Sequence, residues 1–122
     1  MSYNLLEPFK FISAHAMNAS FTSDPQEIKL QDNIGIQLDW TGTPTGTWAF
    51  QISADFKKDI NGNILNAGHW ISLPLSPAIV AAGAADDAYV DFNQLSAAYI
   101  RVVYTAVSGS GTVNGYIVAK GV

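Results

Sequence analysis

The sequence predicts an all-β fold: an antiparallel β-sandwich of the immunoglobulin-like or jelly-roll kind, with an N-terminal arm. Three observations predict it: apolar and polar side chains alternate on both sides of one loop, turn-forming residues recur about every ten residues, and helical periodicity is scarce. The 122 residues suit one domain with a core of its own. We expect residues 1–20 to form an arm or a first strand and residues 21–122 to form the sandwich.

The first half of the chain contains the strongest alternation. Residues 9–16 alternate weakly, and Asp24-Pro25 breaks the chain before a short apolar run at 28–30. The apolar positions of one parity are then Ile34, Ile36, Leu38 and Trp40 before the loop and Trp48, Phe50, Ile52 and Ala54 after it. The positions between them are mostly polar, so the period is two and one face is buried. We interpret residues 33–54 as an amphipathic β-hairpin whose turn spans residues 41–46.

Turn residues divide the second half into shorter strands. The pair Asn61-Gly62 tolerates positive φ, which predicts a tight turn between strands at 50–56 and 69–73. Pro74 and Pro77 end the second of these strands, because proline cannot donate to a ladder. The small residues at 78–85 are compatible with a loop or with one helical turn.

The C-terminal third predicts strands at 88–92, 99–105 and 113–120, with the last two joined as a hairpin by the loop at 108–111. In the middle strand Ile100, Val102 and Tyr104 share one face. Tyr99 follows a bend, like the tyrosine corner of immunoglobulin-like sandwiches, in which the hydroxyl bonds to upstream backbone.

Composition excludes several classes of function. The formal charge is -4, the pI is near 4.7, and the six cations form no basic stripe, which argues against a nucleic-acid partner. The chain has no cysteine, so thiol redox chemistry is excluded. No secretory signal and no apolar run of membrane-spanning length is visible, so we expect a soluble protein made in a cytoplasm.

The residues that could carry chemistry form no recognisable site. His15 and His69 are the only imidazoles, and no nucleophile elbow is present, so we expect no enzyme, no cofactor and no metal. A small hydrolase would need one of these histidines beside a serine and a carboxylate in a cleft.

Two groups of oxygen-bearing side chains could be imagined around a cation. Asp59, Asn61 and Asn63 alternate like the first ligands of a calcium loop, but no acidic residue follows at the distance where a carboxylate would close the shell. The acidic pair at 86–87 and Asp91 have the composition of solvated loop edges. We interpret the first group as a hairpin turn and the second as solvated acids.

Tryptophans offer a sugar-stacking alternative. Trp40 and Trp48 share the parity of the inward aliphatic side chains, which favours core packing. Trp70 is the candidate for a platform, because a flat ring can stack on a sugar.

A dense apolar set near the N-terminus is the candidate partner-binding surface, since it would be adhesive if exposed. The candidates are Tyr3, Leu5, Leu6, Phe9 and Phe11, with Ile12 beside them. They could dock on a neighbouring subunit or form an ordinary first strand in the chain's own core.

Residues 32–47 (DNIGIQLDWTGTPTGT), 99–105 (YIRVVYT) and 108–112 (SGSGT) resemble small β-sandwich proteins among the structural proteins of tailed bacteriophages. The resemblance extends from about residue 20 to the C-terminus, and its motifs are strand and turn patterns rather than site residues. It implies a capsid decoration or cementing subunit that assembles into the virion in the host cytoplasm. The implied partners are the major capsid protein or other virion proteins, and the implied state is a homo-oligomer, a trimer by analogy.

The alternative function is a carbohydrate- or receptor-binding module of a head or tail fibre. Surface placement of Trp70 together with a second aromatic residue would favour it.

Overall fold

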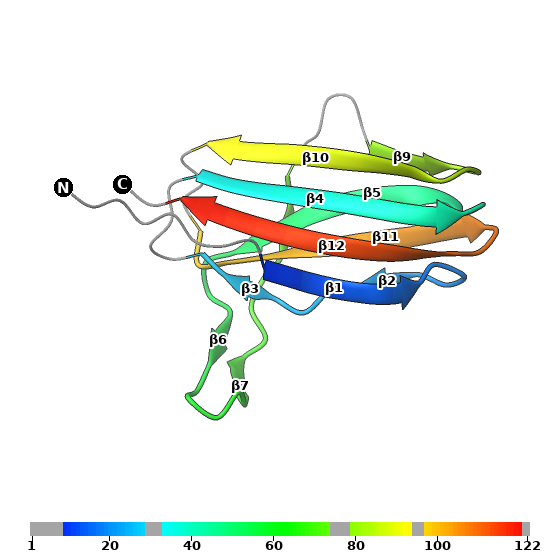
Figure 1. Cartoon of the computed structure of the whole chain (residues 1–122). Helices are drawn as coiled ribbons and strands as arrows, with labels where there is room; N and C mark the ends of the chain where they lie inside the picture. Colours follow the sequence, from blue (N-terminus) through cyan, green and yellow to red (C-terminus); the bar gives the residue numbers. More distant parts are fainter. Residues whose placement is uncertain (1–8, 29–32, 74–78, 94–96, 121–122) are drawn as a thin grey trace.

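A computed structural model describes residues 9–28, 33–73, 79–93 and 97–120, and within these ranges the chain is built of strands and loops without a helix (Figure 1). Two antiparallel sheets form the body. The four-stranded sheet has the order β1 (Phe9–Ala16), β12 (Gly111–Lys120), β4 (Asn33–Gly42), β10 (Asp86–Asn93). The six-stranded sheet contains β2 (Phe21–Thr22), β3 (Gln26–Glu27), β11 (Tyr99–Ser108), β5 (Thr45–Ser53), β8 (Ile71–Ser72) and β9 (Ile79–Ala82).

The strand order identifies the architecture. Across one sheet the order is β1-β12-β4-β10, and the strands in the corresponding positions of the other sheet are β2, β11, β5 and β9. Each pair in corresponding positions is consecutive in the chain, and all four connections lie at the same end of the sandwich, on the right in Figure 1. This arrangement is a jelly roll, so the predicted all-β sandwich is confirmed and the jelly-roll alternative applies.

The two predicted hairpins are wrong in their pairing. β4 pairs with β10 and β12, whereas β5 pairs with β11, β8 and β9, so the loop at 43–44 crosses between the sheets. The loop at 109–110 likewise joins β11 in one sheet to β12 in the other. Alternation identifies which face of a strand is buried. That face is the same whether the next strand in the chain lies beside it in one sheet or packs against it from the other sheet, so the pattern does not reveal the pairing.

The core lies between the inner faces of the sheets, where the predicted parity is confirmed. Its fully buried large side chains include Ile34, Ile36, Leu38, Phe50, Ile100, Val102 and Tyr104, with Trp40 and Trp48 at 3% exposure. The parity fails at the end of β5: Ile52 is only partly buried, Ser53 is buried although its parity predicts a position facing water, and Ala54 lies beyond β5 and is exposed. Two buried polar atoms, Trp48 Nε1 and Tyr104 Oη, have no hydrogen-bond partner in the described part of the chain.

β1 is an irregular edge strand. It pairs with β12, and the register shifts between Lys10 and Ile12 and again between Ile12 and His15. Ala14, within the second shift, has a φ of 47°. Ile12 is buried in the core and Phe11 packs partly against it. Residues 9–16 therefore occupy the position of a first strand in the chain's own sandwich.

Two further expectations are wrong in detail. Residues 79–82, within the stretch expected to be a loop or a helical turn, form β9, which pairs with β5. The Tyr99 hydroxyl donates to the Glu27 carboxylate at 3.1 Å, so the contact is to a side chain and does not have the form of a tyrosine corner. Pro74 and Pro77 lie outside the described residues.

Candidate functional site

A small hairpin projects from the sandwich between β5 and β8 (Figure 1). It consists of β6 (Lys57–Lys58) and β7 (Ile64–Asn66), which form a two-stranded sheet of their own. The predicted tight turn at 59–63 is confirmed, but it joins these two short strands instead of the longer ones expected. Gly62 has a φ of 86°, as the Asn-Gly pair predicted.

Asp59 organises this turn. Its carboxylate accepts the backbone N–H groups of Asn61 and Asn63, each at 2.9 Å, and the Asn63 side-chain amide at 3.2 Å. The hydrogen bond from the Asn63 backbone is the main reason that the pKa of Asp59 lies below its ordinary value. These contacts give the carboxylate a turn-forming role. In the described ranges no cluster of three or more His, Cys, Asp or Glu residues could hold a metal ion.

The hairpin presents apolar side chains to water. Ile60 at its tip is 100% exposed, and Ile64 and Leu65 on β7 are 61% and 63% exposed. Lys57 and Lys58 lie on the opposite strand. A hairpin of this length cannot bury its own side chains, so they remain available to a partner.

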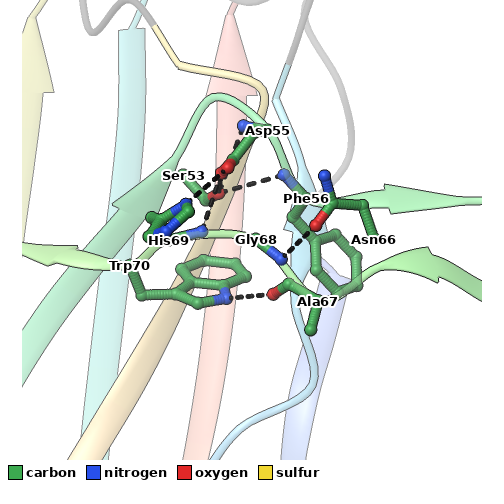
Figure 2. A network of polar contacts seen from close by, with 8 residues as sticks. All are labelled: Ser53, Asp55, Phe56, Asn66, Ala67, Gly68, His69 and Trp70. Atoms are coloured by element: carbon green, nitrogen blue, oxygen red, sulfur yellow. Dashed lines mark hydrogen bonds and ion pairs between the residues drawn. The ribbon is translucent and has the colours of Figure 1, made fainter.

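A polar network fixes the base of the hairpin, as Figure 2 shows. The Ser53 hydroxyl donates to Asp55 Oδ1 at 2.9 Å and accepts the Phe56 N–H at 3.1 Å. Asp55 Oδ1 also accepts the His69 backbone N–H at 2.7 Å, and His69 Nδ1 donates to Asp55 Oδ2 at 2.8 Å. The network therefore ties the entry of the hairpin at 53–56 to its exit at 68–69.

Asp55 and His69 each favour the charged form of the other. The side-chain hydrogen bond from His69 is the main reason that the pKa of the Asp55 carboxyl is held well below its usual range; the His69 backbone N–H and the Ser53 hydroxyl add to the effect. The same hydrogen bond to Asp55 raises the pKa of His69. The His69 side chain is 93% exposed, so solvent screens the pair.

Close packing completes the base. Phe56 is buried, and its ring lies 4.8 Å from that of Tyr99 and 5.4 Å from that of Trp70. Gly68 has a φ of 75°, and a Cβ there would lie 2.9 Å from the Phe56 backbone. The chain can therefore close the hairpin this tightly only with glycine at position 68.

Ser53, Asp55 and His69 are the residue types of a hydrolytic triad in a different arrangement. In a triad the histidine contacts the serine and the carboxylate orients the histidine. Here the Ser53 hydroxyl donates to Asp55, is buried, and has the carboxylate between it and His69 (Figure 2). His69 makes no hydrogen bond to the Ser53 hydroxyl, so the serine–histidine contact that defines a triad is missing from this network. His15 stacks on Phe21 at 3.8 Å and takes no part in this network.

Trp70 does not offer a free platform. Its indole N–H donates to the Ala67 carbonyl at 3.0 Å, and the Arg101 guanidinium lies 4.2 Å from its ring centroid. Arg101 is held in turn by the Gln51 side chain at 2.8 Å. The ring thus packs on its own sheet.

The predicted partner-binding residues are only partly within the described chain. Tyr3, Leu5 and Leu6 lie outside it, while Phe9 is 58% exposed on β1 and Phe11 is half-buried. Sequence reasoning missed the exposed residues of the hairpin. One signal could have found them: Ile60 is an isoleucine inside a turn of otherwise polar residues and glycine.

Comparisons with known proteins relate the chain to others by fold. No protein-family model matches it, and no curated protein matches it. The SPBc2 prophage-derived protein YomS is similar in structure, with a TM-score of 0.57, 14% identity and coverage of 97% of this chain and 96% of that one. A structure of infectious bursal disease virus, Gx strain, has a TM-score of 0.52 and 8% identity, covering 98% of this chain but 32% of that one. At these identities the likeness shows the fold.

In the described ranges, none of the elements is a helix with the length and apolar character needed to cross a bilayer.

Proposed function

We propose that this protein is a non-enzymatic structural subunit of a phage or related viral particle, of the capsid decoration or cementing kind. It acts by binding neighbouring shell subunits, such as the major capsid protein, and the projecting β6–β7 hairpin is its contact element. The observation that carries the proposal is that Ile60, Ile64 and Leu65 are exposed on a hairpin whose base is fixed by hydrogen bonds.

Pre-organisation supports a binding role for the hairpin. A loop that is already ordered loses little conformational entropy when a partner covers it, so the burial of its apolar side chains contributes more fully to affinity. The network around Asp55 and the turn around Asp59 fix the two ends of this element. Lys57 and Lys58 would steer it toward an acidic surface.

The comparisons support the viral part of the proposal. The similar structures include one from a prophage-derived protein and one of a virus, and jelly rolls are common in capsids. The proposal places the protein in the virion. By analogy with shell-capping proteins of this size, we also propose that it forms a trimer.

The N-terminal apolar residues are proposed as a second contact. Tyr3, Leu5 and Leu6 are the candidates, with Phe9 continuing them on the exposed edge strand. Removing residues 1–20 would delete the buried side chains of Ile12 and Met17, so a shorter truncation, of residues 1–8, is the appropriate test.

Co-sedimentation with assembled capsids tests the proposal. We expect the wild-type chain to sediment with capsids and Ile60→Asp to reduce binding at least tenfold. Combining Ile60→Asp with the removal of residues 1–8 should weaken binding further. Val107→Asp is the matched control, because Val107 is 72% exposed and lies away from the hairpin, on β11. Failure of the wild-type chain to bind, or equal binding by Ile60→Asp, would reject the hairpin as the contact element.

Sugar stacking by Trp70 is not favoured as a function. The guanidinium of Arg101 lies over the ring that would have to face the ligand.

A further inference from the structure

The outer face of the four-stranded sheet carries aromatic and acidic side chains in neighbouring rows. One row across β12, β4 and β10 consists of Tyr116, Gln37 and Tyr89, which are direct cross-strand neighbours. The next row on the same face pairs Asp39 with Asp87. These side chains point outward, because their neighbours Leu38, Trp40 and Ile117 are buried. We call this surface the tyrosine face.

Tyr89 lies flat on the sheet. It starts from β10, and a Cβ built at Gly35 on β4 would lie 2.8 Å from Tyr89 Cζ and 3.1 Å from Val118 Cγ1, with the Tyr89 hydroxyl closer still. The tip of the ring therefore occupies the space above Gly35 that any other residue would fill. Tyr89 remains 58% exposed, so the outer side of the ring faces water. Glycine at position 35 is what allows this orientation.

Tyr116 provides a second ring two strands away. Two strand spacings amount to about 10 Å, which is comparable with the length of a disaccharide. Between the rings lies Gln37, whose amide N–H donates to Asp39 Oδ2 at 3.0 Å. Lys10 Nζ, at the end of the row, lies over the Tyr116 ring at 5.8 Å from the ring centroid, so Tyr89 is the more open of the two rings. The row thus has an aromatic ring at each side and hydrogen-bonding groups between them.

Asp39 and Asp87 face each other with like charge. Carboxylates directly opposite on neighbouring strands destabilise a sheet. In the described part of the chain, no lysine or arginine forms an ion pair with either of them. Arrangements that cost stability are expected at functional sites, where a protein departs from its most stable sequence.

We propose that the tyrosine face binds a neutral saccharide. The ring of Tyr89 stacks on the C–H face of one sugar unit, and Tyr116, with Lys10 over its ring, bounds the site on the other side. Asp39, Asp87 and Gln37 accept hydrogen bonds from hydroxyl groups. The two carboxylates exclude anionic sugars by repulsion. This site is distinct from the hairpin and does not depend on the function proposed for it.

The test is NMR titration of the full chain with cellohexaose, maltohexaose and chitohexaose, with sialyllactose as the anionic comparison. We expect at least one neutral oligosaccharide to shift the amides of β4, β10 and β12, and sialyllactose to shift none. Tyr89→Ala should weaken binding about tenfold or more. Asp87→Asn should weaken binding while raising the melting temperature, an opposition that a purely structural role would not produce.

Two controls distinguish the possible outcomes. Phe9→Ala removes an aromatic side chain that is also 58% exposed but lies outside the row, and it should leave saccharide binding unchanged. Ile60→Asp should also leave it unchanged, so the hairpin and the tyrosine face can fail independently. The proposal is overturned if no neutral oligosaccharide binds at millimolar concentration, or if Tyr89→Ala binds as well as wild type. Capsid binding that requires Tyr89 in the absence of any saccharide binding would also overturn it.

Discussion

The Thr43 N–H donates to the Ser110 carbonyl at 2.9 Å and so joins the two loops that carry the chain between the sheets. Thr43 follows β4 and Ser110 precedes β12, and these strands pair along their whole length. The bond continues the β4–β12 ladder into the crossings themselves. The end of the sandwich is thereby closed by backbone contacts between segments more than sixty residues apart in sequence.

Gly109 is expected to be essential to this closure. Its φ is 78°, and a Cβ there would collide with the Thr43 carbonyl oxygen. We expect Gly109→Ala to lower the free energy of unfolding by about 2 to 5 kcal/mol, from backbone strain plus steric overlap. Gly62→Ala is the matched control, because Gly62 has a φ of 86° but nothing within 4 Å of a Cβ, so only about 1 kcal/mol should be lost. Urea denaturation measures both, and equal losses would contradict the contact between the loops.

Tyr104 offers the opposite test, a substitution that stabilises. Its hydroxyl is buried without a partner in the described chain, and burial raises its pKa. Tyr104→Phe removes this desolvated group, so we expect the free energy of unfolding to rise by about 1 kcal/mol. Tyr99→Phe removes a hydroxyl that donates to Glu27, and it should lower stability by about 1 kcal/mol. A loss of stability in Tyr104→Phe would indicate that the hydroxyl has a partner.

The Asp55–His69 pair predicts a pH dependence with a definite sign. The pKa of Asp55 is lowered in the folded state, so its contribution is present above the unfolded value of about 3.9 and is lost as the pH falls through the folded pKa. The pKa of His69 is raised, so its contribution is present below the unfolded value of about 6.5 and is lost as the pH rises through the folded pKa. The pair therefore stabilises most between about pH 4 and 6.5.

Thermal melts of wild type and His69→Gln across this range measure the effect. We expect the difference in melting temperature to be largest in the window and to shrink above it. NMR titration of His69 should give a pKa above the ordinary histidine value, and Asp55→Asn should bring it down. A His69 pKa at or below that ordinary value in wild type would contradict the geometry.

A buried and an exposed isoleucine are expected to differ in their contribution to stability. Ile36 is 1% exposed and Ile60 is 100% exposed. We expect Ile36→Ala to lower the free energy of unfolding by about 2 to 5 kcal/mol, because it leaves a cavity between the sheets. Ile60→Ala should change stability by less than about 0.5 kcal/mol. Chemical denaturation of both variants tests this, and a large effect at Ile60 would mean that the hairpin tip packs against the chain.

Sequence patterns predicted the fold class well because burial in a sandwich has a period of two. The parity of Leu38 and Trp48 was predictable for this reason. The pairing of the strands was not predictable, since alternation carries no information about which strand lies beside β4 or β5. β9 was missed because its four residues, IVAA, are all apolar and so show no alternation between its two faces.

The candidate sites were less predictable than the fold. Asp55 and His69 are 14 positions apart, and only the closure of the hairpin brings them together. Tyr89 and Tyr116 occupy outward positions that pattern reasoning assigns to ordinary polar residues. Their meeting on one row depends on β4 lying between β10 and β12, a topology that the sequence does not reveal locally.

The irregular edge strand β1 limits pairing between copies of the molecule when they are close together. An edge with two register shifts and a left-handed Ala14 does not present the regular ladder that a foreign strand needs, which protects the sheet against fibril growth. The opposite edge, β10, carries Asp86, Asp87 and Asp91, which repel an approaching copy of the same chain. Both edges of the four-stranded sheet therefore resist edge-to-edge pairing between crowded copies of the molecule.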